Sequence, residues 1–288
     1  MFHRLFSIFM LFVFSGFAQA REPLRMPSAP IPVPSKGNAG YDMNYYAGPV
    51  ISHVHIHLVY WGEGVDSEVQ TKLDKFYRGI VNSTYMDQLA EYATNIPGKD
   101  GRMGTNQNIG RGSFGQTVTI HPFNLSKNLS QSDVEQELEK QIASGSLPSP
   151  DNDALYMIHF PSGYQIKISF GDSCLSWFAD HEVYKSPTFG NVYYSVFPCG
   201  NSLNSFQKLT IAASHELGEA VTDPMSPLEG APIIYPAAWL TGDGKEIGDV
   251  CAWQKADLKV GDTSFSVQNL WLKSLGVCYQ ADFTSSEK

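Results

Sequence analysis

Apolar residues recur at helical spacing over 205–222, and this stretch carries the longest helix pattern in the chain. Asp223-Pro224 ends it, because a residue before proline is disfavoured in the helical conformation. Shorter patterns predict helices over 66–80 and 85–92. The sequence Ser132-Asp-Val-Glu135 is typical of a capping box and predicts a further helix to about Ala143.

Aromatic and β-branched residues predict five strands, over 49–61, 116–120, 154–160, 164–170 and 191–197. In the first of these, apolar residues share one face, and the other face carries His53, His55 and His57. We expect this histidine row to be a solvated polar face, with metal chelation as the alternative interpretation.

Helices and strands interleave without the regular spacing of βαβ units, so the sequence predicts an α+β fold with a mixed β-sheet. Residues 242–278 show only short strand patterns and loops, and neither an internal repeat nor a second linker is visible. We therefore expect one domain over 48–288.

The first 20 residues have the pattern of a secretory leader. A basic start is followed by 13 apolar-rich residues, 5–17, and then by Ala18-Gln19-Ala20, which fits signal-peptide cleavage. A membrane-spanning helix needs roughly 18 or more apolar residues, so we expect no membrane span. The sequence predicts a signal peptide over 1–20, a proline-rich tether over 21–47, and secretion to the periplasm or the extracellular space.

Charge and cysteine content agree with export. The formal net charge is −9, and it becomes −10 when Arg4 leaves with the leader. An acidic chain without basic clusters argues against nucleic acid as a partner. The four cysteines predict two disulfides in an oxidising compartment, and of three possible pairings we favour Cys174 with Cys199 and Cys251 with Cys278.

The chemistry of the chain centres on His215-Glu-Leu-Gly-Glu219 in the predicted helix over 205–222. His215 and Glu219 are one helical turn apart, so both side chains can reach the same ion. Imidazole nitrogen and carboxylate oxygen are both zinc ligands, and Glu216 beside them could take a proton from metal-bound water. This is the His-Glu-x-x-His arrangement of zincin peptidases, with Glu219 in place of the second histidine.

A solvated polar helix face is the alternative interpretation of this motif. Glu219 and Asp223 lie in the last helical turn, where the helix dipole and their mutual repulsion both disfavour negative charge. A bound cation would relieve both effects, and we therefore favour metal binding.

A third metal ligand is expected from Glu246-Ile-Gly-Asp249, where two acids precede Cys251. We favour Glu246 as the ligand, with Asp249 orienting a ligand side chain; the reverse assignment is about as plausible, and Asp223 is a weaker candidate. The site would then be a divalent metal centre formed by His215 and Glu219 with Glu246 or Asp249. Zinc is the first expectation, and the extra carboxylate also makes Mn²⁺ or Ca²⁺ acceptable.

Several stretches resemble the bacterial relatives of the plant EXORDIUM, or phosphate-induced, proteins. The resemblance covers most of 48–280 and rests on 82–92, 109–112, 214–224 and 246–251. It implies an extracellular protein with a metallopeptidase-like, or zincin-like, catalytic fold. The chain differs from zincin peptidases at Glu219. Two carboxylates and one histidine leave a bound divalent ion electrically neutral, and a neutral site acidifies its bound water less.

We predict a secreted metal-dependent hydrolase, most simply a metallopeptidase that acts on peptides or proteins with Glu216 as its general base. The alternatives are a non-catalytic extracellular module with a structural metal, which would bind a surface ligand, and a carbohydrate-binding wall protein. Asp180-His181 could place a transition-state donor near the metal. Trp177, Tyr235 and Trp239 could line a substrate cleft, although aromatic residues more often belong to the core.

Overall fold

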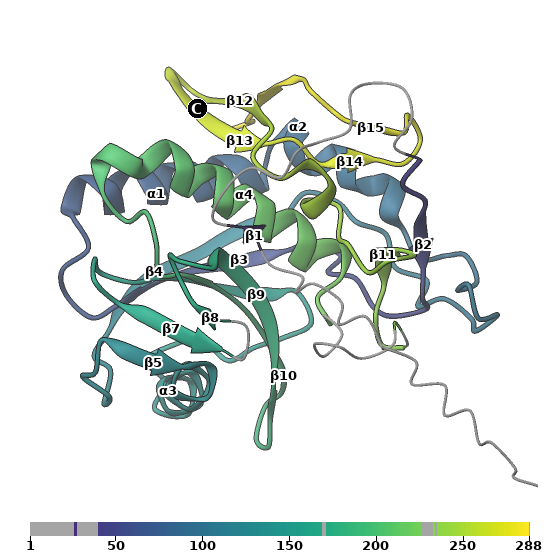
Figure 1. Ribbon diagram of the computed structural model, residues 1–288. Coiled ribbons are helices and arrows are strands. Elements are labelled where there is room, and N and C mark those ends of the chain that lie inside the picture. Colours follow the sequence, from purple (N-terminus) through teal and green to yellow (C-terminus); the bar gives the residue numbers. More distant parts are fainter. Residues whose placement is uncertain (1–25, 28–39, 169–170, 226–232, 234, 288) are drawn as a thin grey trace, which may run out of the picture.

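The computed structural model describes residues 26–27, 40–168, 171–225, 233 and 235–287 (Figure 1). The predicted signal peptide lies outside the described residues, and so do 21–25 and 28–39 of the predicted tether. The described chain is a mixed α/β fold with several sheets and four α-helices, which agrees with the predicted fold class at that level.

A six-stranded mixed sheet lies at the centre of the structure. Its strands, in spatial order, are β1 (Met26–Pro27), β9 (Trp177–Ser186), β10 (Gly190–Phe197), β6 (Ala154–His159), β3 (His55–Trp61) and β4 (Ser113–Ile120). The pairs from β10 through β4 are parallel, whereas β9 pairs antiparallel with both β10 and β1. Parallel strands are usually covered on both faces, and this sheet follows that rule.

Two helical layers cover the sheet. One face packs against α1 (Ser67–Val81) and α4 (Phe206–Thr222), and the other packs against α3 (Gln131–Ala143) (Figure 1). Alternate residues of β3 divide between the two cores, so that Leu58 faces the α1 and α4 side and Val59 faces the α3 side. A small sheet of β5 (Asn128–Ser130), β7 (Gln165–Ile168) and β8 (Gly171–Asp172) lies beside α3.

Helix α4 is covered on two sides. It contacts β9 and β10 of the central sheet, and it also contacts β13 (Thr263–Gln268), which belongs to a second sheet with β12 (Lys255–Val260) and β16 (Asp282–Thr284). Every residue of α4 from Leu209 to Thr222 is buried as a result. Polar side chains on this helix must therefore find partners inside the protein.

The remaining elements are short. They comprise α2 (Thr84–Asp87), the 3₁₀ helices η1 (Gln88–Tyr92), η2 (Leu203–Ser205) and η3 (Asp249–Cys251), and the strands β2 (Met43–Tyr45), β11 (Trp239–Thr241), β14 (Trp271–Leu272) and β15 (Val277–Cys278). None of the helices in the described part of the chain has the length and hydropathy of a membrane span.

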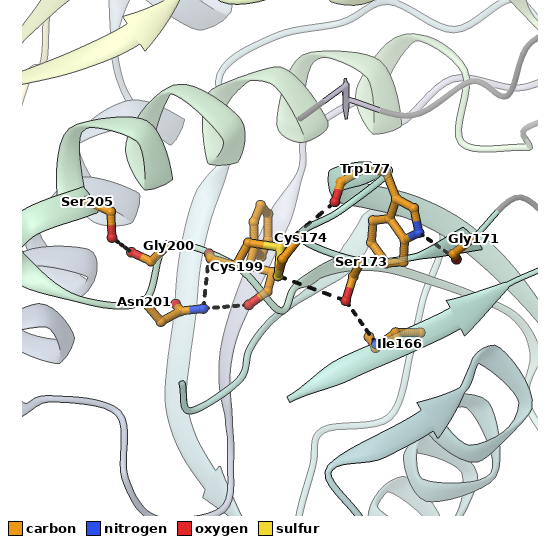
Figure 2. Close-up of a disulfide and its surroundings, with 10 residues drawn as sticks. Ile166, Gly171, Ser173, Cys174, Trp177, Cys199, Gly200, Asn201 and Ser205 are labelled. Carbon is orange, nitrogen blue, oxygen red and sulfur yellow. Dashed lines mark hydrogen bonds between the residues drawn. A yellow bond between two sulfur atoms is a disulfide. The ribbon is translucent and has the colours of Figure 1, made fainter. Parts of the chain in front are cut away.

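Both disulfides join the cysteines that the sequence favoured. Cys174 pairs with Cys199 and Cys251 pairs with Cys278, with Cα atoms 5.5 Å and 5.6 Å apart. Figure 2 shows the first bond next to Asn201, whose side-chain amide donates to the Cys199 carbonyl. This bond fixes the segment that leads into α4, and the second fixes the segment that contains Asp249. Two disulfides suit a chain that folds outside the cytosol.

Four details differ from the sequence predictions. The capping box of α3 is formed by Ser130 and Asp133 instead of Ser132 and Glu135. Strand β9 was not predicted, because residues 180–182 are all polar. The described residues Met26, Met43 and Tyr45 of the expected tether are buried in strands. His57 is buried between strands of the parallel sheet, so the expected solvated histidine face is wrong at that position.

Candidate metal centre

Helix α4 brings His215, Glu216 and Glu219 to one buried point beside β9. His215 and Glu219 are one turn apart, and His215 Nε2 lies 3.0 Å from Glu219 Oε2. Glu216 Oε1 lies 3.9 Å from the same nitrogen. The predicted juxtaposition of these side chains is therefore present, but the solvated helix face is excluded because all three residues are 0 % exposed.

The segment that precedes Cys251 supplies the expected further acids. The ligand atoms of Asp249, His215 and Glu219 all lie within 4.8 Å of one another, which is close enough for one ion. The Asp249 backbone N–H donates to Glu219 Oε1 at 2.8 Å, and the Glu246 N–H donates to Asp249 Oδ2 at 3.1 Å. Of the two acids, Asp249 and not the favoured Glu246 has a ligand atom in this group.

Gly248 allows this segment to approach α4 closely. A Cβ atom at position 248 would lie 2.7 Å from both Glu219 Oε1 and His215 Nδ1, so any larger residue would displace the segment or the two side chains. The glycine between the two acids is thus required by the packing of the site.

His181 on β9 enters the same centre from the opposite side. Its Nδ1 lies 3.2 Å from Glu216 Oε2, and its Nε2 lies 3.3 Å from Glu246 Oε1. Together with Glu216 and Glu219 it forms a second group of ligand atoms within 4.8 Å of one another. His181, the predicted donor, therefore lies at the candidate metal centre. The structure additionally makes His181 the link between Glu216 and Glu246.

Several buried polar atoms at this centre make no hydrogen bond within the described structure. They are His215 Nε2, Glu216 Oε1, Glu219 Oε2 and both carboxylate oxygens of Glu246. Buried polar groups without a hydrogen-bond partner are rare in native proteins and call for an explanation, such as an ion. These atoms include the ones at which a cation would be held.

Burial raises the pKa of every carboxyl group at this centre. It raises the pKa of Glu219 to about 8 and that of Asp223 to about 7. It also raises the pKa values of Glu216, Glu246 and Asp249 above their ordinary range, against the attraction of the nearby histidines. For His181, burial opposes the charged form, but the Glu246 and Glu216 carboxylates raise its pKa well above the ordinary value. Without a cation, burial therefore favours the protonated form of these carboxyl groups.

Gln268 on β13 orients the His215 ring. Its side-chain oxygen accepts from Trp253 N–H at 2.9 Å and its amide nitrogen donates to Gly248 O at 2.9 Å, and these two contacts fix the orientation of the amide. The same nitrogen lies 2.7 Å from His215 Nδ1 and must act as the donor there. A neutral His215 consequently carries its proton on Nε2, toward Glu219. Metal binding at Nε2 would replace that proton and require the amide of Gln268 to turn over.

A divalent cation fits the donor set formed by His215, Glu219 and Asp249. One imidazole nitrogen and two carboxylates match zinc, and oxygen-rich sets of this kind also suit Mn²⁺. His215 Nε2 and Glu219 Oε2, neither of which makes a hydrogen bond within the described structure, belong to this set. Glu246 is placed beside His181 as its charge partner.

Other predicted residues lie outside the centre or at its border. Asp223 Oδ1 accepts from Ala238 N–H at 2.8 Å and caps the end of α4, and its backbone oxygen lies 3.3 Å from His181 Nε2. Trp177 and Trp239 are core residues, and Tyr235 is an exposed residue beside Arg102. His53 is exposed, and its Nδ1 donates to the Arg111 carbonyl at 3.1 Å, away from the centre.

Sequence reasoning missed Gln268 and gave His181 only a minor role. The acidic neighbours of His181 are distant in sequence, and Gln268 lies in a strand whose only local signal is alternation. Comparisons of the chain with protein-family models, with curated proteins and with solved structures find no match.

Proposed function

We propose that this chain is a secreted hydrolase that uses one divalent metal ion, with zinc as the first expectation, to cleave peptides. The observation that carries the proposal is the convergence of His215, Glu219 and Asp249, with ligand atoms within 4.8 Å of one another, in a buried centre rich in unpaired acids. The motif stretches that resemble EXORDIUM relatives include all three residues and support the same proposal.

The charge of the site supports a cation. Five buried acids, Glu216, Glu219, Asp223, Glu246 and Asp249, surround two histidines, and none of the ion pairs at this centre involves a lysine or an arginine of the described chain. Isolated carboxylates in a protein interior either bind a proton or require a positive partner. A divalent ion would supply that charge and allow the acids to remain ionised at neutral pH.

Glu216 is the residue best placed to move a proton. When bound, a metal ion of this kind activates a water molecule and polarises a substrate carbonyl. Glu216 adjoins the ligand residues, and its Oε1 makes no hydrogen bond within the described structure. Burial raises its pKa toward the range in which a carboxylate is an effective general base. Its second oxygen contacts His181, which can hold the carboxylate in position.

The complete burial of the candidate metal centre favours a second possible function. In this alternative the metal only stabilises the fold of an extracellular binding module. His181, His215, Glu216, Glu219 and Glu246 are all at most 2 % exposed, and a hydrolase must admit its substrate. A structural ion needs no such access. The two functions differ in whether Glu216 matters for anything besides folding.

The deciding experiment compares Glu216→Gln with Glu137→Gln, which replaces an equally buried glutamate on α3. Each protein is loaded with zinc and incubated with a peptide library, and metal content is measured in parallel. For a hydrolase, Glu216→Gln should lower the rate by about 10²–10⁴-fold while retaining its zinc, because only the proton transfer is removed. Glu137→Gln should retain the wild-type rate.

Unchanged cleavage by Glu216→Gln would show that Glu216 is not the base. A zinc-loaded wild type that cleaves no peptide, together with a large loss of thermal stability on zinc removal, would favour the structural-metal module.

A further inference from the structure

The chain's own residues Met26 and Pro27 occupy the edge of β9 next to the candidate metal centre. Strand β1 pairs antiparallel with β9, with Met26 opposite Ala179 and Pro27 opposite Trp177. The other edge of β9 is paired with β10 along most of its length. Strand β1 therefore covers the free edge of the strand that carries His181 (Figure 1).

This edge lies close to the residues proposed for chemistry. Ala179 and His181 are two residues apart in β9 and so point to the same face, toward α4. Two residues of a strand span about 7 Å. Strand β1 also contacts α4 itself, the helix that carries His215 and Glu219.

Met26 inserts its side chain completely into the protein. It is 0 % exposed and belongs to the same core as Ala179, Leu209, Ala213 and Leu217. Methionine is unbranched and flexible, so it can fill a site that also accepts other long apolar side chains. The edge thus offers backbone pairing together with one apolar site, which is how a sheet edge recognises an extended peptide.

The pairing of β1 is short enough to be reversible. Among the described residues of this segment two pair, the register is irregular between them, and Pro27 has no N–H to donate. Because the segment belongs to the same chain, it competes intramolecularly with any free peptide. A weakly paired segment can therefore occupy the site and still be displaced.

We propose that the edge of β9 at Trp177–Ala179 is a binding site for extended peptides with a long apolar side chain, and that Met26–Pro27 occupies it as an intramolecular inhibitor. The role as an inhibitor rests on the proposed peptidase function, whereas peptide binding at the edge does not. Strand β1 contacts both β9 and α4, the two elements that carry His181 and His215. Peptide substrates would bind antiparallel to β9 once β1 leaves.

The test uses a fluorescein-labelled synthetic peptide with the sequence of residues 21–28, and its binding to the full chain is followed by fluorescence anisotropy. Met26→Asp places a charge in the apolar site and should release β1. The control is Met43→Asp, which changes a buried methionine in β2, a strand that pairs with β11 and not with β9. We expect metal-free Met26→Asp to bind the peptide at least 10-fold more tightly than the wild type or Met43→Asp. A peptide with Asp in place of Met should not bind.

Equal peptide affinity of folded Met26→Asp and the wild type would overturn the proposal. If Met26→Asp does not fold, a site-specific protease sequence inserted after Pro34 allows the folded chain to be cut. The cut protein should then exchange its own segment for labelled peptide, and failure to exchange would also overturn the proposal.

Zinc-loaded proteins separate this inference from the proposed function. Faster peptide cleavage by Met26→Asp than by the wild type, with inhibition by the synthetic peptide, supports both. Tight peptide binding without cleavage by any variant would rule out the proposed hydrolase function, but it would support peptide binding at the edge of β9. Equal cleavage by both proteins, with equal peptide affinity, would rule out the inhibitory role of Met26–Pro27, but it would support the proposed hydrolase function.

Discussion

His159 and His181 are two buried histidines whose side chains face the same side of the central sheet, and their surroundings differ in charge. His159 Nδ1 donates to Asn201 Oδ1 at 2.8 Å, because the amide nitrogen of Asn201 is already donating to the carbonyls of Phe197 and Cys199. Its Nε2 accepts from Tyr77 Oη at 2.9 Å. Both ring nitrogens have neutral partners, and the ring stacks on Phe197. His159 is therefore a structural residue.

His181 has carboxylates where His159 has neutral partners. Glu216 and Glu246 lie at its two nitrogens, and carboxylate atoms of both acids have no hydrogen-bond partner within the described structure. Burial lowers the pKa of His159 to about 3, whereas the neighbouring carboxylates raise the pKa of His181. Burial of a histidine alone therefore does not indicate metal binding. Buried carboxylates around the histidine that lack hydrogen-bond partners are the stronger indication.

The largest expected effect concerns the metal-dependent part of stability. At a metal concentration about 1,000-fold above Kd, binding to the native state adds about 4 kcal/mol to the free energy of unfolding. Glu219→Gln removes one anionic ligand and should lose most of this increment, while Glu137→Gln should keep it. The measurement is thermal unfolding with and without excess zinc. An equal zinc-induced shift in both variants would mean that Glu219 does not contact the ion.

His159→Phe should destabilise the protein without affecting the metal. It leaves the Tyr77 hydroxyl and the Asn201 carbonyl buried without their partner, which should lower the free energy of unfolding by about 2–4 kcal/mol. Urea denaturation measures the loss, and zinc titration of the folded variant should give the wild-type affinity. A large drop in zinc affinity would contradict the assignment of His159 as purely structural.

A pH dependence of stability is also expected from His159. Its pKa is about 3 in the folded protein and about 6.5 in the unfolded chain, so the unfolded chain binds more protons between these values. Stability from this group is therefore present above pH 6.5 and is lost as the pH falls toward 3. His159→Phe should flatten the dependence of unfolding free energy on pH in that window. An unchanged slope would mean that another group causes it.

The sequence predicted the parts of the site that lie within short segments. The helix over 205–222 matches α4 to within one residue, and the spacing of His215 and Glu219 fixes their common side of the helix. The two acids before Cys251 could be singled out because they lie three residues apart in one short segment. The expected compartment predicts two disulfides, and of the three possible pairings the favoured one, between neighbours in sequence, is the one observed.

The sequence could not predict what depends on distant segments. Burial of the polar side of α4 results from β9 and β13, which flank it from opposite sides. His181 belongs to a strand whose polar residues gave no alternation signal, and Gln268 reaches His215 from a separate sheet. The pairing of Met26 with β9 joins residues that are more than 150 positions apart, and no local pattern indicates it.

The central claim is that a divalent cation binds between α4 and the segment around Asp249. The most direct measurement is anomalous diffraction at the zinc edge from crystals of the zinc-loaded protein. We predict one strong peak about 2.0–2.3 Å from His215 Nε2, Glu219 Oε2 and a carboxylate oxygen of Asp249. The absence of a peak at this position in zinc-loaded crystals, or a peak only at surface residues such as His53, would contradict the claim.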